Sequence, residues 1–171
     1  MTVTAATTPR ERMLLAKDAA RVVALLDDRR KRALLHAMAD AIDDATPVIV
    51  SANAEDLERG RSDGLSEALQ DRLRLDADRV SALANAVRDV AALPDPVGRV
   101  LDERTLATGL RLQKVSVPFG VVGSIYEARP NVTVDIASLA LRAGNAVVLR
   151  GGSAAERTNA ALVSAMRLAL A

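Results

Sequence analysis

The first half of the chain carries apolar residues at the spacing of amphipathic helices. The clearest stripe consists of Val80, Leu83, Ala84, Val87 and Val90; Asp76 precedes it as a cap and Pro94 follows it. Similar cap and proline signals occur earlier, where Thr8, Pro9 and Glu11 form a capping box and Thr46 precedes Pro47. We predict helices over residues 9–26, 46–57, 66–72 and 77–93, and a further helix that opens after Asp27 or Asp28 and includes residues 34–42.

The pattern changes to short extended runs after residue 98. RVLDERT and GLRLQKVSVP predict a pair of strands that turn near Gly109. VVGSIY then predicts a buried strand, residues 132–143 an apolar helix that ends at Gly144, and residues 146–149 a second buried strand. Strand, helix and strand of these lengths favour a parallel βαβ unit. A capping box of Ser153 and Glu156 predicts a last helix that runs to the end of the sequence.

The predicted architecture is α/β, with a helical N-terminal region followed by one βαβ unit. Two parallel strands alone leave both edges of the sheet open, and the last helix lacks a glycine, proline or polar stop signal. We therefore expect further strands, from a longer chain or from a partner.

Composition narrows the possible functions. The chain has 171 residues, of which 50% are hydrophobic and 26% charged, and this composition is typical of soluble globular proteins. A net charge of +1 with one Phe, one Tyr and no Trp argues against nucleic-acid binding. No apolar run is long enough for a membrane span, and the N-terminus does not resemble a signal peptide.

Cysteine is absent from the sequence, so it supplies no disulfide and no cysteine nucleophile, and we expect a reducing cytoplasmic compartment. His36 is the one histidine, and we interpret it as a structural or surface residue. We interpret the basic cluster at residues 29–32 as a solvated face. The paired carboxylates at 27–28 and 43–44 are assigned to helix ends and solvent, with no acid or base role.

The turn RGGS is a candidate anion site, because Arg150, Gly151, Gly152 and Ser153 lie between a buried strand and a helix. Glycine allows close approach of the backbone, the helix N-terminus favours negative charge, and Arg150 adds a cation. The spacing matches neither the common dinucleotide fingerprint nor a P-loop. A tight turn with Ser153 as a helix cap is an equally good interpretation.

The loop YEARPN is a second candidate, since Glu127, Arg129 and Asn131 follow the first parallel strand, where open α/β sheets bind ligands. The alternatives remain open. Asn131 also suits an N-cap of a helix that starts at Val132, and Glu127 also suits an ion pair with Arg129.

Two long strings carry a resemblance to a known family. VPFGVVGSIYEARPNVTVDIASLALRAGNAVVLRGGSAAERTN (residues 117–159) and SANAEDLERGRSDGLSEALQDRL (residues 51–73) resemble the gamma-glutamyl phosphate reductases, members of the aldehyde dehydrogenase superfamily. The resemblance covers nearly the whole chain but only the N-terminal portion of family members. It implies three parts: residues 1–98 as the helical part of the cofactor domain, 99–118 as an extended ribbon for oligomerisation, and 119–171 as the first unit of an incomplete Rossmann-type domain.

The resemblance implies a cytoplasmic homo-oligomeric enzyme that reduces L-glutamyl 5-phosphate to L-glutamate 5-semialdehyde and phosphate with NADPH, in proline biosynthesis. Family members use a cysteine thioester, and the resemblance places that cysteine beyond residue 171. We therefore expect the isolated chain to be inactive. The alternative is a non-catalytic fragment that serves only as a cofactor-binding or oligomerisation module.

The resemblance also implies roles for individual residues. Arg150, Gly151, Gly152 and Ser153 correspond to the part of the superfamily that contacts the adenosine ribose, and their chemistry suits the 2′-phosphate of NADPH. Asn131 corresponds to the asparagine that stabilises an oxyanion during thioester formation, with Arg129 or Glu127 as alternatives in the substrate loop. No metal is implied.

Overall fold

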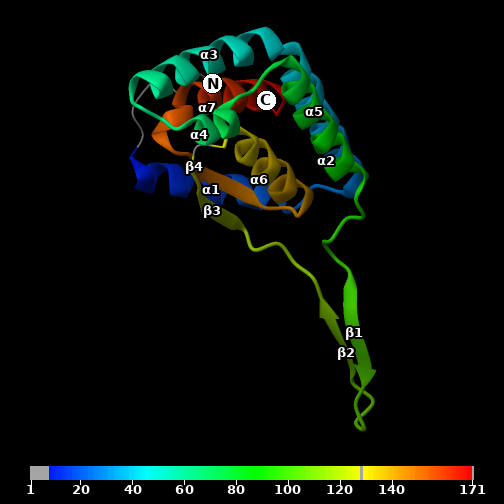
Figure 1. Ribbon diagram of the computed structural model, residues 1–171. Coiled ribbons are helices and arrows are strands. Elements are labelled where there is room, and N and C mark those ends of the chain that lie inside the picture. Colours follow the sequence, from blue (N-terminus) through cyan, green and yellow to red (C-terminus); the bar gives the residue numbers. More distant parts are fainter. Residues whose placement is uncertain (1–7, 128, 171) are drawn as a thin grey trace.

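The computed structural model describes residues 8–127 and 129–170; residues 1–7, Ala128 of the YEARPN loop and Ala171 lie outside this part. The described elements follow one another as α1 (Pro9–Val23), α2 (Asp28–Asp44), α3 (Thr46–Ser62), α4 (Glu67–Leu73), α5 (Ala77–Ala92), β1 (Val100–Thr105), β2 (Arg111–Val115), β3 (Val121–Ile125), α6 (Pro130–Arg142), β4 (Ala146–Arg150), the 3-10 turn η1 (Ser153–Ala155) and α7 (Glu156–Ala169). The protein is thus mixed α/β, mostly helical, with small sheets (Figure 1).

Local capping signals located the starts of α1, α2 and α5. The capping box of Thr8 and Glu11 opens α1, the Asp27 carboxylate accepts from the amide of Arg30 at the start of α2, and the Asp76 carboxylate accepts from Arg79 at the start of α5. The cap predicted at Thr46 is wrong. Thr46 lies inside the first turn of α3, and its hydroxyl donates to the carbonyl of Asp43 at 2.7 Å.

Helix α3 extends five residues beyond its predicted end at residue 57. Gly60 lies inside the helix, and α3 ends in a Schellman motif around Gly64. Gly64 has a φ of +76°, and the amide of Leu65 donates to the carbonyl of Gly60 at 2.8 Å. Gly144 ends α6 in the same way, with a φ of +72°, as the sequence predicted.

The two sheets differ in their surroundings. Strands β1 and β2 form an antiparallel ribbon that extends away from the helices and is exposed at every position (Figure 1). Strands β3 and β4 pair in parallel, which confirms the predicted βαβ unit.

The prediction that β3 and β4 are buried is wrong for most of their positions. The side chains are largely half-buried, and Ile125 is 78% exposed. Helices α1 and α6 contact this sheet, but within the described residues no third strand extends it. The burial that such apolar strands favour is therefore not completed by residues 8–127 and 129–170.

One hydrophobic core joins the helical N-terminal region to the βαβ unit. Fully buried Leu35, Met38 and Val80 from α2 and α5 belong to the same cluster as Val134 of α6 and Leu162 of α7. Among the described residues, no helix is both long enough and apolar enough to cross a membrane.

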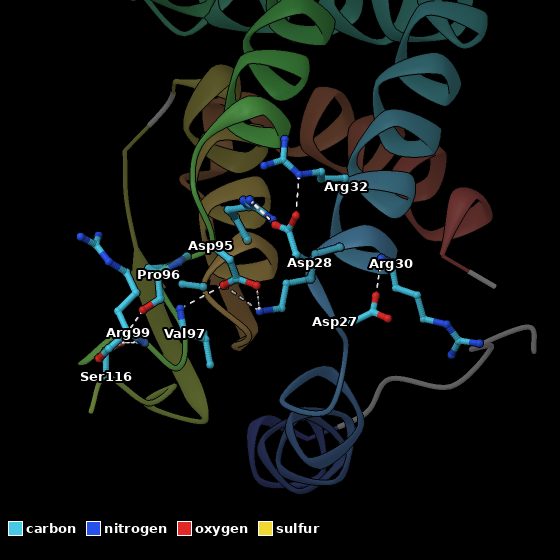
Figure 2. A network of polar contacts seen from close by, with 12 residues as sticks. Asp27, Asp28, Arg30, Arg32, Asp95, Pro96, Val97, Arg99 and Ser116 are labelled. Carbon is cyan, nitrogen blue, oxygen red and sulfur yellow. Dashed lines mark hydrogen bonds and ion pairs between the residues drawn. The ribbon is translucent and has the colours of Figure 1, made fainter. Parts of the chain in front are cut away.

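A polar network fixes the base of the ribbon to the core (Figure 2). Lys31 is 1% exposed, and its Nζ donates to both carboxylate oxygens of Asp95, at 3.0 and 2.9 Å. Asp95 also accepts from the amide of Val97 at 3.0 Å. After β2, the hydroxyl of Ser116 donates to the carbonyl of Pro96 and accepts from the amide of Arg99, so it joins the two ends of the ribbon. The interpretation of residues 29–32 as a solvated face is therefore wrong for Lys31, because Asp95 offers a buried partner 64 positions away.

Two arginines complete this network. Arg142, buried in the last turn of α6, donates to the carbonyl of Leu93 and lies 2.6 Å from Asp28 as an ion pair. Arg32 donates to the carbonyl of Leu93 as well, and to Asp28 at 2.8 Å. Hydrogen bonds from Arg32 and then Arg142 lower the pKa of Asp28. Asp28 thus links α2 to α6 instead of serving only as a solvated helix end.

Candidate functional site

The RGGS turn connects β4 to α7 in a different way from the one predicted. Ser153 begins the 3-10 turn, and α7 starts only at Glu156. The predicted capping box of Ser153 and Glu156 is absent, because neither the 3-10 turn nor α7 receives a side-chain cap from its own cap residue. Arg150 and Ser153 are exposed at the surface of this turn, and Gly151 and Gly152 are half-buried.

A buried carboxylate from α3 caps α7 instead. Asp56 is fully buried and accepts from the amide of Thr158 at 2.8 Å, from its hydroxyl at 2.7 Å and from the amide of Arg157 at 3.4 Å. Arg59 donates to the same carboxylate at 2.8 Å and to the carbonyl of Ser153 at 2.7 Å. The backbone amides of Arg157 and Thr158 are thus already bonded to Asp56. An anion at this turn must therefore use Arg150, Ser153 and the backbone amides before Arg157.

Gly151 lies close to a row of hydrogen-bonded side chains, formed by Tyr126, Thr133 and Asn159, between the two candidate loops. A Cβ at Gly151 would collide with the side-chain amide of Asn159, and would also lie 3.3 Å from the ring of Tyr126. Asn159 accepts from the hydroxyl of Thr133 at 2.7 Å, and that hydroxyl lies 2.5 Å from the hydroxyl of Tyr126. The absence of a side chain at Gly151 therefore allows α7 to approach the turn.

A cavity of about 310 Å³ adjoins this turn. Its lining residues are Arg59, Gly60, Asp63, Leu65, Ser153, Ala154 and Glu156. Of the predicted cofactor residues, only Ser153 belongs to this lining, while Arg150, Gly151 and Gly152 lie outside it. Sequence reasoning missed Arg59, because nothing near it in the sequence indicates that α3 faces the turn.

The loop after β3 places its three candidates differently from one another. The backbone amide of Arg129 donates to the carbonyl of Glu127 at 2.9 Å, and no ion pair joins these two side chains among the described contacts. Helix α6 begins at Pro130, so Asn131 lies in its first turn and the N-cap interpretation of Asn131 is wrong. Asn131 donates to Asp135 at 3.4 Å, and partial burial raises the pKa of Asp135.

A second cavity, of about 400 Å³, brings two of these candidates together with side chains from α4 and α5. Its lining residues are Asp71, Arg72, Arg74, Leu75, Arg79, Ala82, Leu83, Arg129, Pro130 and Asn131. Glu127 is exposed and does not belong to the lining. No pattern in the sequence predicted this cavity, because its walls come from segments that meet only after folding.

The two candidate loops lie at the same edge of the sheet. Ile125 pairs with Arg150 in the parallel register, and the amide of Tyr126 donates to the carbonyl of Arg150 at 3.1 Å. This adjacency agrees with the expectation that ligands bind beyond the carboxyl ends of parallel strands. His36 is exposed on α2, which agrees with its interpretation as a structural or surface residue. The described residues contain no group of three or more metal-binding side chains.

Comparisons with known proteins give consistent results. The chain is 61% identical over 155 residues to a gamma-glutamyl phosphate reductase of Kineococcus radiotolerans, a match that covers 91% of this chain and 36% of that relative. The crystal structure of gamma-glutamyl phosphate reductase from Thermotoga maritima matches with a TM-score of 0.91 at 41% identity, over 94% of this chain and 39% of that one. The corresponding structure from Saccharomyces cerevisiae matches with a TM-score of 0.89 at 29% identity, over 96% of this chain and 42% of that one.

No protein-family model matches the chain. The sequence relative and both structures nevertheless carry the same name, and each match leaves more than half of the other protein uncovered. The chain is therefore a homologue of gamma-glutamyl phosphate reductases, and it spans only about two fifths of their length.

Proposed function

We propose that this chain forms part of an NADPH-dependent reductase that converts L-glutamyl 5-phosphate to L-glutamate 5-semialdehyde and phosphate, in cytoplasmic proline biosynthesis. The observation that carries the proposal is the 61% identity over 155 residues to a gamma-glutamyl phosphate reductase. The positions of the two candidate loops, side by side at one edge of the β3–β4 sheet, support it. The βαβ unit is then the first unit of a Rossmann-type domain whose remaining strands extend the open sheet.

The donors of the RGGS turn fit the phosphate groups of NADPH. Arg150 is exposed and forms no ion pair with any described residue, and the hydroxyl of Ser153 forms no hydrogen bond there. Both groups are therefore free to donate to a 2′-phosphate, which NADH lacks. Bound NADPH supplies reducing power, and the role of this turn is to hold and orient it. Gly151 keeps the turn compact because Asn159 occupies the space of its missing side chain.

Asn131 is proposed to stabilise the oxyanion that develops when the acyl phosphate is attacked. Its amide now donates to Asp135 over 3.4 Å, a long hydrogen bond that a substrate oxygen can replace. The attacking cysteine must come from another segment or chain, because these 171 residues contain none. The isolated chain is accordingly expected to show no reductase activity.

The ribbon is proposed to mediate homo-oligomerisation. Both of its strands are exposed along their whole length, including the apolar Leu101, Leu112 and Val115. Exposed apolar residues on a two-stranded ribbon whose outer edges pair with no further described strand favour association with another surface. The absence of cysteine also supports a second candidate function, a non-catalytic module that binds cofactor or assembles without reducing any substrate.

A chimaera tests the proposal. In it, this chain replaces the segment that it matches in the Kineococcus radiotolerans reductase, so that the remainder supplies the missing residues. We expect NADPH-dependent reduction of L-glutamyl 5-phosphate, with a preference for NADPH over NADH that Arg150→Ala lowers by about tenfold. Asn131→Ala should lower kcat and leave the KM for NADPH nearly unchanged. A folded chimaera without activity would favour the non-catalytic module.

A further inference from the structure

We propose that the cavity between the α4–α5 segment and the start of α6 binds the oxyanion of a small acidic substrate, through Arg72, Arg74 and Arg129. The inference rests on the proposed function and deepens it, because it adds Arg72 and Arg74, which neither the sequence patterns nor the comparisons indicate, to the candidate Arg129 of the loop after β3. The substrate class is a short acyl phosphate or carboxylic acid.

The first argument is charge. Four guanidinium groups line the cavity, from Arg72, Arg74, Arg79 and Arg129, against the single carboxylate of Asp71. The chain as a whole balances 23 basic against 22 acidic residues, whereas this lining carries four cations against one carboxylate. A concave site lined by one sign of charge raises the local concentration of ligands of the opposite sign.

The second argument is that three of these cations have no partner of their own. Arg79 is fixed, since it pairs with Asp71 at 3.0 Å and donates to the carbonyl of Arg74 at 3.0 Å. The guanidinium groups of Arg72, Arg74 and Arg129 form no hydrogen bond or ion pair within residues 8–127 and 129–170. They are available to a ligand, and guanidinium groups bind phosphate and carboxylate oxygens through paired hydrogen bonds.

The third argument is that the backbone carrying Arg74 is held rigidly. Asn53 of α3 is 1% exposed; its amide donates to the carbonyl of Leu73 at 2.8 Å, and its carbonyl accepts from the amide of Leu75 at 2.7 Å. Arg74 thus lies between two residues that a buried side chain anchors. A binding group on a fixed backbone loses less conformational entropy when its ligand binds.

The remaining walls select the kind of molecule. Leu75, Ala82 and Leu83 give one side an apolar lining, and the side chain of Asn131 adds a neutral donor and acceptor. The volume of about 400 Å³ lies in the range of small-molecule sites. A short aliphatic chain with an oxyanion at its end satisfies both the apolar and the basic parts of this lining.

Binding to the 171-residue chain itself tests the inference. Isothermal titration with acetyl phosphate probes the acyl phosphate end of such a substrate, and titration with L-glutamate probes the carboxylate end. We expect one of the two to bind, and Arg74→Ala or Arg129→Ala to weaken its binding by about tenfold each. Arg104→Ala removes the same charge from the exposed ribbon and should leave the affinity unchanged. Thermal melts of all variants show whether each is folded.

Three results would overturn the inference. They are the absence of binding by both probes, equal weakening by Arg74→Ala and Arg104→Ala, and displacement of the probe by NADPH, which would make this cavity a cofactor subsite. In the chimaera, Arg74→Ala and Arg129→Ala should each raise the KM for L-glutamyl 5-phosphate without changing that for NADPH, and Arg104→Ala should change neither. An active chimaera with an unchanged KM would refute the inference alone, whereas an inactive chimaera with arginine-dependent probe binding would refute the proposed function alone.

Discussion

The capping of α7 by Asp56 makes a quantitative prediction about stability. Replacing Asp56 by Ala removes a fully buried carboxylate that accepts from the amide and the hydroxyl of Thr158 and from Arg59. Thr158 is itself fully buried, so its amide is left without a partner after the substitution. The effect should therefore be large, because an orphaned buried donor costs its whole desolvation free energy.

The magnitude follows from the number of buried bonds. Two hydrogen bonds to Thr158 are buried, and each hydrogen bond to a charged group contributes about 1.5–3 kcal/mol. Two other hydrogen bonds of this region survive the substitution and limit the loss: Asn53 still donates to the hydroxyl of Thr158 at 3.2 Å, and Arg59 still donates to the carbonyl of Ser153. We expect Asp56→Ala to lower the free energy of unfolding by about 3 kcal/mol.

Urea unfolding followed by circular dichroism measures this loss. The matched control is Glu58→Ala on the same helix. It removes an exposed carboxylate whose one ion pair within the described residues is with Arg61, and it should change stability by less than about 0.5 kcal/mol. Asp56→Asn keeps one oxygen acceptor and should fall between wild type and Asp56→Ala. A loss below about 1 kcal/mol for Asp56→Ala, or one equal to that of Glu58→Ala, would refute the capping role.

Three further substitutions test other parts of the account. Lys31→Ala leaves Asp95 without its buried partner, and we expect urea unfolding to show a loss of about 3 kcal/mol; a loss below about 1 kcal/mol would contradict the pairing. Burial raises the pKa of Asp135 in the folded state, which costs stability as pH rises through the titration range, so Asp135→Asn should raise Tm at pH 7 but not at about pH 3. An equal shift in Tm at both pH values would contradict this. Gly151→Ala should lower Tm through its collision with Asn159, and the added substitution Asn159→Ala should restore part of the loss; no recovery would exclude the collision.

Features that depend on neighbouring residues could be predicted from the sequence. The capping box of Thr8, the cap at Asp76 and the left-handed Gly144 each involve groups within a few positions, and each is confirmed. The parallel pairing of β3 and β4 was also predicted, because a short βαβ unit allows few other arrangements.

Features that depend on distant residues could not be predicted. Asp56 caps α7 from 102 positions away, and a carboxylate within a helix pattern gives no sign of such a partner. Lys31 belongs to a run of basic residues, and nothing in that run indicates that Lys31 pairs with Asp95, 64 positions away. The basic cavity has the same origin, since Arg129 meets Arg72 and Arg74 only when α6 packs beside α5.

Turnover by the chimaera tests the central claim most directly, namely that this chain supplies the matched part of a gamma-glutamyl phosphate reductase. Consumption of NADPH in the presence of L-glutamyl 5-phosphate should proceed in the chimaera within about tenfold of the parent enzyme's rate, and should be absent with the 171-residue chain alone. A folded chimaera that binds NADPH but consumes none, or a homogeneous isolated chain that turns over, would contradict the account.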